Sequence, residues 1–268
     1  MNLNTLENKK VWVTGASSGI GRELAILAAS GGAELFLFSS RIEPLSETAE
    51  ICGKHGAHKV HFEAVDLSKE TSAVEITRKT IEKSGPPDFL ILNAGISQRS
   101  KGLETSLETT RKIMELNFFA SVAIARTAVP AMLASGGGHI GVTSSVTGVF
   151  GFPLRTAYAA SKHALHGYFE SLGMEYSSEG LKVTIIVPGR IRTEISKKSL
   201  LGDGSLYSKD DPGQINGMDV KVCAQKYWAA VVKGKREKVI GKFDIIMVFF
   251  YRYVRRLFFF LGERVSPV

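Results

Sequence analysis

Short apolar runs alternate along the chain with longer segments in which apolar residues recur three or four positions apart. The short runs are typical of β-strands, and the longer segments are typical of amphipathic helices. Strands are expected at 11–15, 34–40, 59–67, 88–95, 138–145, 182–189 and 237–243. One helix is expected directly after the first strand, and others at 43–55, 69–84, 106–134, 158–179 and 219–234.

The alternation of strands and helices predicts the fold class. Strands joined through helices form parallel sheets, and right-handed crossovers place the helices on both faces. We therefore predict an α/β protein with a doubly wound Rossmann fold, built on a parallel sheet of about seven strands. No low-complexity stretch interrupts residues 1–242, which are expected to form a single domain with a lid near 190–220. Residues 243–268 are expected to form an appended tail.

Composition and charge narrow this picture. With 268 residues, of which 44% are hydrophobic and 22% are charged, the chain has the size and balance of one large globular domain. The formal net charge of +8 is local, because residues 221–268 hold 11 of the 34 Lys and Arg residues but 3 of the 26 Asp and Glu residues. The two cysteines, Cys52 and Cys223, are far apart, and the first ten residues contain no apolar run. Both observations favour a cytoplasmic protein.

A glycine-rich stretch, TGASSGIG, joins the first expected strand to the first expected helix. Gly15, Gly19 and Gly21 permit a tight turn there and let backbone N–H groups approach a pyrophosphate, which the positive end of the helix also attracts. The spacing differs from the usual GxGxxG pattern, and a simple strand-to-helix turn is the alternative.

Tyr158 and Lys162 stand four residues apart at the start of an expected helix, so their side chains share one face. A lysine cation beside a phenol favours the phenolate and lowers the tyrosine pKa from about 10. The pair is therefore typical of a proton donor or acceptor that works nearer neutral pH. A solvated surface pair is the alternative.

These motifs together resemble the short-chain dehydrogenase/reductase family, in the branch with TGxxxGxG and YxxxK motifs, over about residues 10–242. The matching stretches are TGASSGIG, VDL ending at Leu67, LNAG from Leu92, Asn117 in MELNFFA, Ser145, YAASK from Tyr158 and PGRIRT from Pro188. Seven matches in the same order are hard to obtain by chance. Members similar to this chain include membrane-associated reductases of carbonyl, steroid and keto-lipid substrates.

The resemblance implies a catalytic set of four residues. Ser145, thirteen positions before the tyrosine, would hydrogen-bond the substrate oxygen in preference to Ser144. Tyr158 would exchange the proton, and Lys162 would hold the nicotinamide ribose and tune the tyrosine. Asn117 would position a water that connects Lys162 to solvent.

The resemblance also implies which residues bind a nicotinamide dinucleotide. They are Thr14, Gly15, Ser17, Ser18, Gly19, Ile20 and Gly21 in the loop, Ser40, Arg41, Asp66, Leu67, Asn93, Ala94 and Gly95 on the adenosine side, and Tyr158, Lys162, Pro188, Gly189, Ile191 and Thr193 toward the nicotinamide. For Asp66, a helix cap is the alternative, and for LNAG a helix-breaking turn.

The second expected strand indicates which dinucleotide is used. It ends in FSSRIE, with no acid at Ser39 or Ser40 to bind ribose hydroxyls, and Arg41 comes next. A 2′-phosphate needs donors and positive charge, so NADP(H) is favoured, with Ser17, Ser40 and Arg41 as its contacts. NAD(H) is the alternative, since Arg41 can also be a solvated loop residue and Glu43 lies close.

The resemblance implies hydride transfer between the nicotinamide and a carbonyl carbon, in the reducing direction if NADP(H) is used. Phe150 and Phe152, between the expected serine and tyrosine, favour a small-molecule substrate that is lipophilic, although core packing or a subunit contact fits them equally well. Family members commonly form homodimers or homotetramers. A non-catalytic, cofactor-sensing Rossmann protein, anchored by its tail, is the alternative function.

The tail, FDIIMVFFYRYVRRLFFFLGERVSPV, has apolar content close to that of a membrane span, but Arg252, Arg255 and Arg256 stand in its middle. Each would cost about 2.5 to 3.5 kcal/mol at a bilayer centre. At helical spacing the three arginines share one face, opposite an apolar face of Phe250, Tyr253, Val254, Leu257 and Leu261. This pattern predicts one amphipathic helix in peripheral contact with a membrane. A subunit contact or a cap over the pocket is the alternative.

Two further partner classes are disfavoured by the sequence. The basic tail is rich in Phe and lacks a distributed basic face on the domain, so nucleic-acid binding is not expected. The six histidines form no pattern of metal ligands, and no metal site is predicted.

Overall fold

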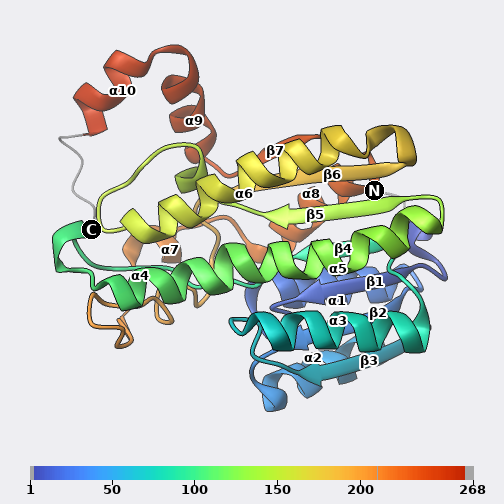
Figure 1. Ribbon diagram of the computed structural model, residues 1–268. Coiled ribbons are helices and arrows are strands. Elements are labelled where there is room, and N and C mark those ends of the chain that lie inside the picture. Colours follow the sequence, from blue (N-terminus) through green and yellow to red (C-terminus); the bar gives the residue numbers. More distant parts are fainter. Residues whose placement is uncertain (1–2, 210, 263–268) are drawn as a thin grey trace.

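Seven parallel strands form one sheet in the order β3-β2-β1-β4-β5-β6-β7 (Figure 1). The computed structural model describes residues 3–209 and 211–262. The strand order reverses between β1 and β4, which is the arrangement of a doubly wound sheet. The predicted fold class is therefore confirmed. The strands are β1 (Lys10–Thr14), β2 (Glu34–Ser39), β3 (Lys59–Ala64), β4 (Phe89–Leu92), β5 (Gly138–Thr143), β6 (Leu181–Pro188) and β7 (Glu237–Ile240).

Helices cover both faces of this sheet (Figure 1). One buried cluster joins the sheet to α1, α2 and α8, and another joins it to α3, α5 and α6. The α-helices are α1 (Gly19–Ser30), α2 (Ile42–Lys54), α3 (Glu70–Ser84), α4 (Leu107–Met114), α5 (Ala120–Ala134), α6 (Thr156–Glu175), α7 (Pro212–Ile215), α8 (Val220–Val232), α9 (Asp244–Tyr253) and α10 (Arg255–Gly262). Short 3-10 turns occur at Leu3–Leu6, Gly102–Glu104, Val146–Gly148 and Ser177–Glu179.

The helix expected at 106–134 is continuous but irregular. A π-helical segment, Glu115–Phe119, joins α4 to α5. The whole helix, Leu107–Ala134, is long and apolar enough to cross a membrane by length and composition. However, Ala120, Ile124 and Ala128 are buried in the cluster that covers the sheet, so it is a core helix.

The tail folds differently from the prediction of one amphipathic helix. It forms two helices, α9 and α10, because the backbone leaves the helical region at Val254, with φ −133° and ψ 52°. This bend lets Phe258 of α10 reach Phe150, at 4.8 Å between ring centroids, and form a buried cluster with Val248 of α9.

The three arginines of the tail consequently do not share a face as predicted. Arg252 forms an ion pair with Glu237 of β7 at 2.6 Å, whereas the Arg255 guanidinium lies 4.9 Å from the centre of the Tyr251 ring. The side chain of Leu261 and all of residues 263–268, which the predicted tail included, lie outside the part that the structure describes.

Candidate active site

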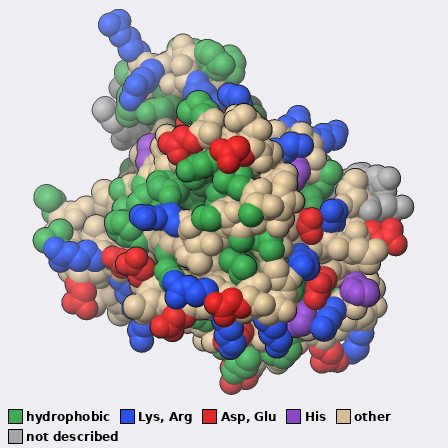
Figure 2. Space-filling model, turned by 45° about the vertical axis from the view of Figure 1, so that its right-hand side comes forward, with side chains coloured by type: hydrophobic (Ala, Val, Ile, Leu, Met, Phe, Trp, Pro, Cys, Tyr) green, Lys and Arg blue, Asp and Glu red, His purple; other side chains and the backbone are tan. Residues whose placement is uncertain are grey.

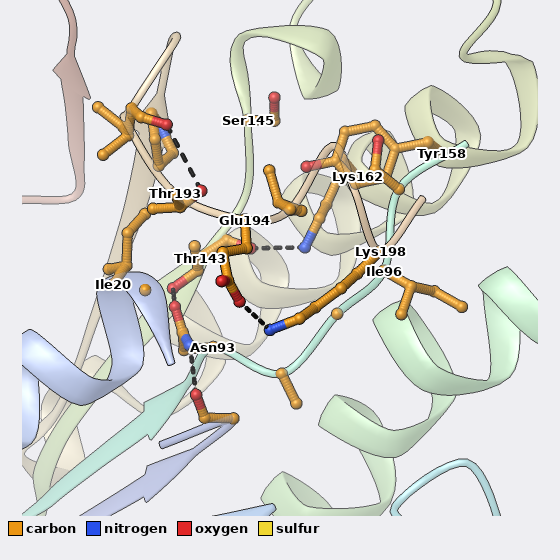
Figure 3. A pocket seen from close by; sticks show the side chains of 18 of the residues that line it. Ile20, Asn93, Ile96, Thr143, Ser145, Tyr158, Lys162, Thr193, Glu194 and Lys198 are labelled. Atoms are coloured by element: carbon orange, nitrogen blue, oxygen red, sulfur yellow. Dashed lines mark hydrogen bonds and ion pairs between the residues drawn. The ribbon is translucent and has the colours of Figure 1, made fainter. Parts of the chain in front are cut away.

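A cavity of about 370 Å³ opens at the carboxyl ends of the strands, around the switch point between β1 and β4. Figure 3 shows Tyr158 and Lys162 on one side of it and Ile20 on the other. The expected site residues that line it are Gly15, Ser17, Ser18, Gly19, Ile20, Ser40, Arg41, Asp66, Leu67, Asn93, Ala94, Gly95, Ser145, Tyr158, Lys162, Pro188, Gly189, Ile191 and Thr193. Three others, Thr14, Gly21 and Asn117, lie behind its wall.

The glycine-rich loop has the shape that a pyrophosphate needs. Gly15 has φ +67°, which side chains rarely adopt, and a Cβ on Gly21 would collide with the carbonyl oxygen of Gly15. The N-cap residue of α1, Ser18, makes no side-chain hydrogen bond to the helix, and the first turn holds no acid. The amides of this turn therefore remain available to an anion, and the residues present fit a dinucleotide phosphate.

Thr14 positions this loop rather than lining the cavity. Its hydroxyl accepts hydrogen bonds from the amides of Asn93 at 2.9 Å and Ala94 at 3.1 Å, and it donates to the carbonyl of Ile91 at 3.3 Å. The side-chain amide nitrogen of Asn93 in turn donates to the Thr14 carbonyl at 3.2 Å. These bonds tie the ends of β1 and β4 together across the switch point.

The end of β2 carries no carboxylate toward the cavity. The Ser39 hydroxyl donates to Ser17 at 2.7 Å, while Ser40 and Arg41 are exposed and line the cavity. Glu43, the acid that follows Arg41 closely in the sequence, does not line the cavity. Asp66 lines the cavity and also accepts bonds from the amide and hydroxyl of Ser68, and its predicted cofactor contact stays a prediction.

Ser145 is held as a hydrogen-bond donor. Its oxygen accepts bonds from the amide of Thr147 at 3.2 Å and from the Thr147 hydroxyl at 3.0 Å, and it is hydrogen-bonded to Tyr158. Ser144 is occupied elsewhere, because it bonds His166 at 2.8 Å and the Lys162 carbonyl at 3.3 Å. The two serines therefore differ in their hydrogen-bond partners, and the role of Ser145 on a substrate oxygen stays a prediction.

Tyr158 and Lys162 are both buried in the cavity wall. The Lys162 ammonium donates to the carbonyl of Thr143 at 2.8 Å and lies 5.8 Å from the centre of the Tyr158 ring. Burial lowers the pKa of Lys162 to about 8.

The expectation that Lys162 lowers the pKa of Tyr158 is corrected by this geometry. Burial raises the Tyr158 pKa above its ordinary value, because the phenolate would lose hydration. The hydrogen bond from Ser145 and the charges of Arg155 and Arg99 oppose that rise. The phenol is therefore neutral in the free protein, with its proton in place.

Asn117 sits in the π-helical segment, where it is fully buried. Its side-chain oxygen accepts from the amide of Ile96 at 2.8 Å, and its nitrogen donates to the Ile96 carbonyl at 3.0 Å and to Ser161 at 2.9 Å. Ser161 donates to the carbonyl of Tyr158 at 2.7 Å, so Asn117 braces the helix that carries the tyrosine. The side chain is fully engaged, and the predicted water contact stays a prediction.

The sequence patterns did not indicate four residues of this site: Gln98 supports the wall of the cavity, and Arg99, Arg155 and Asp211 line it. Gln98 accepts hydrogen bonds from the amides of Ala157 at 2.8 Å and Tyr158 at 3.3 Å and thereby caps α6. Arg99 and Arg155 line the cavity with Asp211. The available signals were positional, since Gln98 and Arg99 follow LNAG closely and Arg155 stands three residues before the tyrosine.

The apolar part of the cavity combines the segment after β5 with the tail. Phe150, Phe152 and Val146 line it together with Met247 of α9. Phe150 also packs against Phe258, so it both lines the cavity and belongs to a buried cluster, and its predicted contact with a substrate stays a prediction. Among the described residues, no cluster of three His, Cys, Asp or Glu side chains is arranged to hold a metal ion.

The chain is similar to known short-chain dehydrogenases. Residues 9–203 match the family model described as short chain dehydrogenase. The dehydrogenase/reductase SDR family member 7B of Danio rerio is 36% identical to this chain over 241 residues, which cover 88% of this chain and 78% of that protein.

Solved structures share the fold. A short-chain dehydrogenase from Streptomyces avermitilis has a TM-score of 0.82 at 25% identity, covering 97% of this chain and 98% of that one. A protein from Beutenbergia cavernae, described as an NAD(P)-dependent gluconate 5-dehydrogenase and solved with bound NADP, has a TM-score of 0.68 at 30% identity, covering 71% and 75%.

Proposed function

Because this chain belongs to the short-chain dehydrogenase family and is therefore an oxidoreductase, we propose that it reduces a lipophilic ketone or aldehyde with NADP(H). The observation that carries this proposal is the contact between Ser145 and a neutral, buried Tyr158, with the Lys162 ammonium beside them in the same cavity. This set supplies a hydrogen-bond donor, a proton and a cation to one substrate oxygen.

The residues of the chain act on the substrate oxygen. When bound, NADPH supplies the hydride for the carbonyl carbon. The Ser145 oxygen already accepts two hydrogen bonds from Thr147, so Ser145 acts as a donor, and its hydrogen can turn from Tyr158 to the substrate oxygen. Tyr158 then donates its proton to the oxygen as negative charge develops there. The nearby charges of Arg155 and Arg99 stabilise the resulting phenolate.

Three residues at the end of β2 and in the glycine-rich loop support NADP(H) over NAD(H). The end of β2 presents Ser40 and Arg41 to the cavity, and Ser17 lies beside them. These groups offer donors and positive charge to a 2′-phosphate. The Beutenbergia cavernae protein was solved with bound NADP, which supports a nicotinamide cofactor without fixing the choice for this chain.

The apolar side of the cavity supports a lipophilic substrate. Phe150, Phe152 and Met247 line it, and the segment 190–220, which contributes Thr193 and Gln214, would close over it as a lid. The tail exposes Phe243, Phe249 and other apolar side chains close to its arginines, which supports peripheral contact with a membrane.

Oligomerisation is supported by a different surface. Leu107, Phe119 and Met174 are exposed on α4, the π-helical segment and α6, which is consistent with a homodimer or homotetramer. Light scattering on the purified protein measures this state directly.

The experiment that tests the proposal follows NADPH oxidation by absorbance against aliphatic, aromatic, steroid and long-chain keto-lipid carbonyls. We expect turnover with at least one class, faster with NADPH than with NADH. Tyr158→Phe should reduce kcat by about a hundredfold or more, because the proton donor is removed. Tyr168→Phe, on the same helix but outside the cavity, is the matched control and should retain activity. Tight NADPH binding without turnover on any carbonyl would instead support a cofactor-sensing role.

A further inference from the structure

Two arginines from distant parts of the chain converge on one carboxylate in the cavity. Arg99 follows β4, Arg155 is the N-cap residue of α6, and Asp211 precedes α7. Asp211 lies 2.7 Å from the Arg99 guanidinium and 3.5 Å from that of Arg155. All three side chains line the cavity. The site therefore carries two guanidinium groups around a single shared acid.

The two arginines are not equally satisfied. Arg99 donates to Ser97, to the Gln98 carbonyl, to Ser196 and to Asp211, at 2.7 to 3.3 Å. Within the described chain, Arg155 makes two long hydrogen bonds, to the Leu154 carbonyl at 3.4 Å and to Asp211 at 3.5 Å. A guanidinium has five N–H donors, and the Arg155 residue is only 8% exposed. The Arg155 guanidinium is therefore held by longer hydrogen bonds than that of Arg99, although it lines the cavity and is largely buried.

The other charged groups around Arg155 do not neutralise its positive charge. Arg190 adds positive charge. Glu194 is already paired with Lys198, four residues further along the same segment (Figure 3). Among the described acids that line the cavity, Asp66 lies at the end of β3 and Asp244 packs against Gly189. Burial and the charge of Arg99 lower the pKa of Arg155 to about 9, which is consistent with an excess of positive charge there.

The backbone directly before Arg155 has an unfavourable conformation. Leu154 has φ 63°, a conformation that branched side chains rarely adopt. Such strain persists where the surrounding structure enforces it, and it concentrates at functional sites. Because Arg155 begins the helix that carries Tyr158, its guanidinium lies close enough for its charge to act on the phenol.

We propose that Arg155, supported by Arg99, binds an anionic group of the substrate, a carboxylate or a phosphate, while the reacting carbonyl contacts Ser145 and Tyr158. Arginine suits such a group, because its planar donors match two acceptor oxygens. The apolar remainder of the substrate would lie against Phe150 and Phe152. The substrate class is thus an amphiphilic keto acid or keto phosphate, a specification that rests on the proposed reductase function.

The first test uses matched substrates. The kcat/KM values of medium-chain keto acids are compared with those of their methyl esters, and those of keto phosphates with those of the corresponding keto alcohols. We expect the wild type to prefer one kind of anion by about tenfold to a hundredfold, as for a charge-assisted hydrogen bond. The carboxylate and phosphate pairs show which anion is recognised. Equal kcat/KM values within both pairs would overturn the inference and leave the reductase proposal standing.

Variants assign that preference to a residue. Arg155→Gln should reduce the anion-to-neutral ratio of kcat/KM by about tenfold, and Arg155→Lys should retain part of it. Arg192→Gln removes an exposed arginine that pairs with Asp219 outside the cavity, and it should keep the ratio. A ratio that is unchanged in Arg155→Gln, or that falls equally in Arg192→Gln, would contradict the assignment to Arg155.

A binding measurement separates this inference from the reductase proposal. With NADP⁺ at saturation, which occupies the cofactor's phosphate sites, calorimetry compares a medium-chain alkyl phosphate, the alkanoate of the same length and the neutral alcohol. Tighter binding of an anion that is lost in Arg155→Gln would support the anion site even if no carbonyl were turned over. No preference for either anion over the alcohol would overturn it.

Discussion

At the scale of a single residue, the buried charge of Lys162 lowers the stability of the free protein. Burial lowers its pKa from 10.5 to about 8. Between these values the unfolded chain binds more protons than the folded chain, so the free energy of unfolding rises with pH in this window. The Lys162 charge therefore destabilises the free protein at neutral pH. Burial of Tyr158 raises the pKa of its phenol, which has the opposite sign and acts only above about pH 10.

We predict that replacing this lysine changes the pH dependence of stability. The difference in unfolding free energy between Lys162→Met and wild type should move by about 1 kcal/mol against the variant from pH 7 to about pH 9, as the wild type sheds its penalty. The lost bond to Thr143 costs the variant a constant amount and does not affect this trend. Denaturant unfolding at several pH values measures it, with Lys182→Met on the exposed side of β6 as control. A pH-independent difference would contradict the buried-cation account.

At the scale of an element, helix α6 is positioned by a side chain from another segment. Its N-cap residue, Arg155, makes no side-chain cap, and Gln98 accepts the amide hydrogen bonds of Ala157 and Tyr158 instead. Gln98 also donates to Thr105 at 2.7 Å, so the loop after β4 fixes where the helix begins. The orientation of Tyr158 consequently depends on Gln98, which does not line the cavity.

We predict that Gln98→Ala lowers stability by about 2 kcal/mol, because two buried amides lose their acceptor. It should also lower kcat by about tenfold with less effect on KM, since the phenol is displaced from the reacting oxygen. Ser106→Ala is the matched control, because it removes the cap of α4 through the Thr109 amide without touching α6. The control should lose stability and keep kcat. If both variants kept kcat, Gln98 would be a structural cap alone.

The elements also show what sequence reasoning reached and where it failed. The strands, the glycine loop and the Tyr158 and Lys162 pair follow from local patterns, because each pattern lies within one strand, turn or helix, whereas Ser145 was implied by the family resemblance. Arg155 was missed because its importance depends on Arg99 and Asp211, which approach it only in the fold. The bend at Val254 was missed for the same reason, since it follows from packing between Phe258 and Phe150. Periodicity alone predicts one continuous helix in the tail, whereas tertiary contacts divide it into two.

At the scale of the whole molecule, the tail joins the cavity to the surface. Met247 lines the cavity, while Phe243 and Phe249, on the same short segment, are 80% and 55% exposed. Figure 2 shows the C-terminal helices projecting from the body, with hydrophobic and basic side chains side by side. Because α9 and α10 also pack against Phe150, a truncation at Lys242 would open the cavity as well as remove the exposed surface. Point variants of exposed residues are therefore the sharper test of membrane contact.

We predict that the protein floats with vesicles containing anionic lipid, less with zwitterionic ones, and less again as salt is raised. The double variant Phe243→Ser/Phe249→Ser should reduce vesicle binding by about tenfold or more, since each exposed ring would bury apolar area in the interface. Phe62→Ser is the matched control, because Phe62 is 44% exposed on β3, at the opposite edge of the sheet from the tail. It should bind vesicles as the wild type does. If the wild type bound neither kind of vesicle, or if both variants lost binding equally, the exposed rings of the tail would have to serve another contact, such as a second subunit. Activity on a soluble carbonyl should be retained in the double variant, because its two positions do not line the cavity.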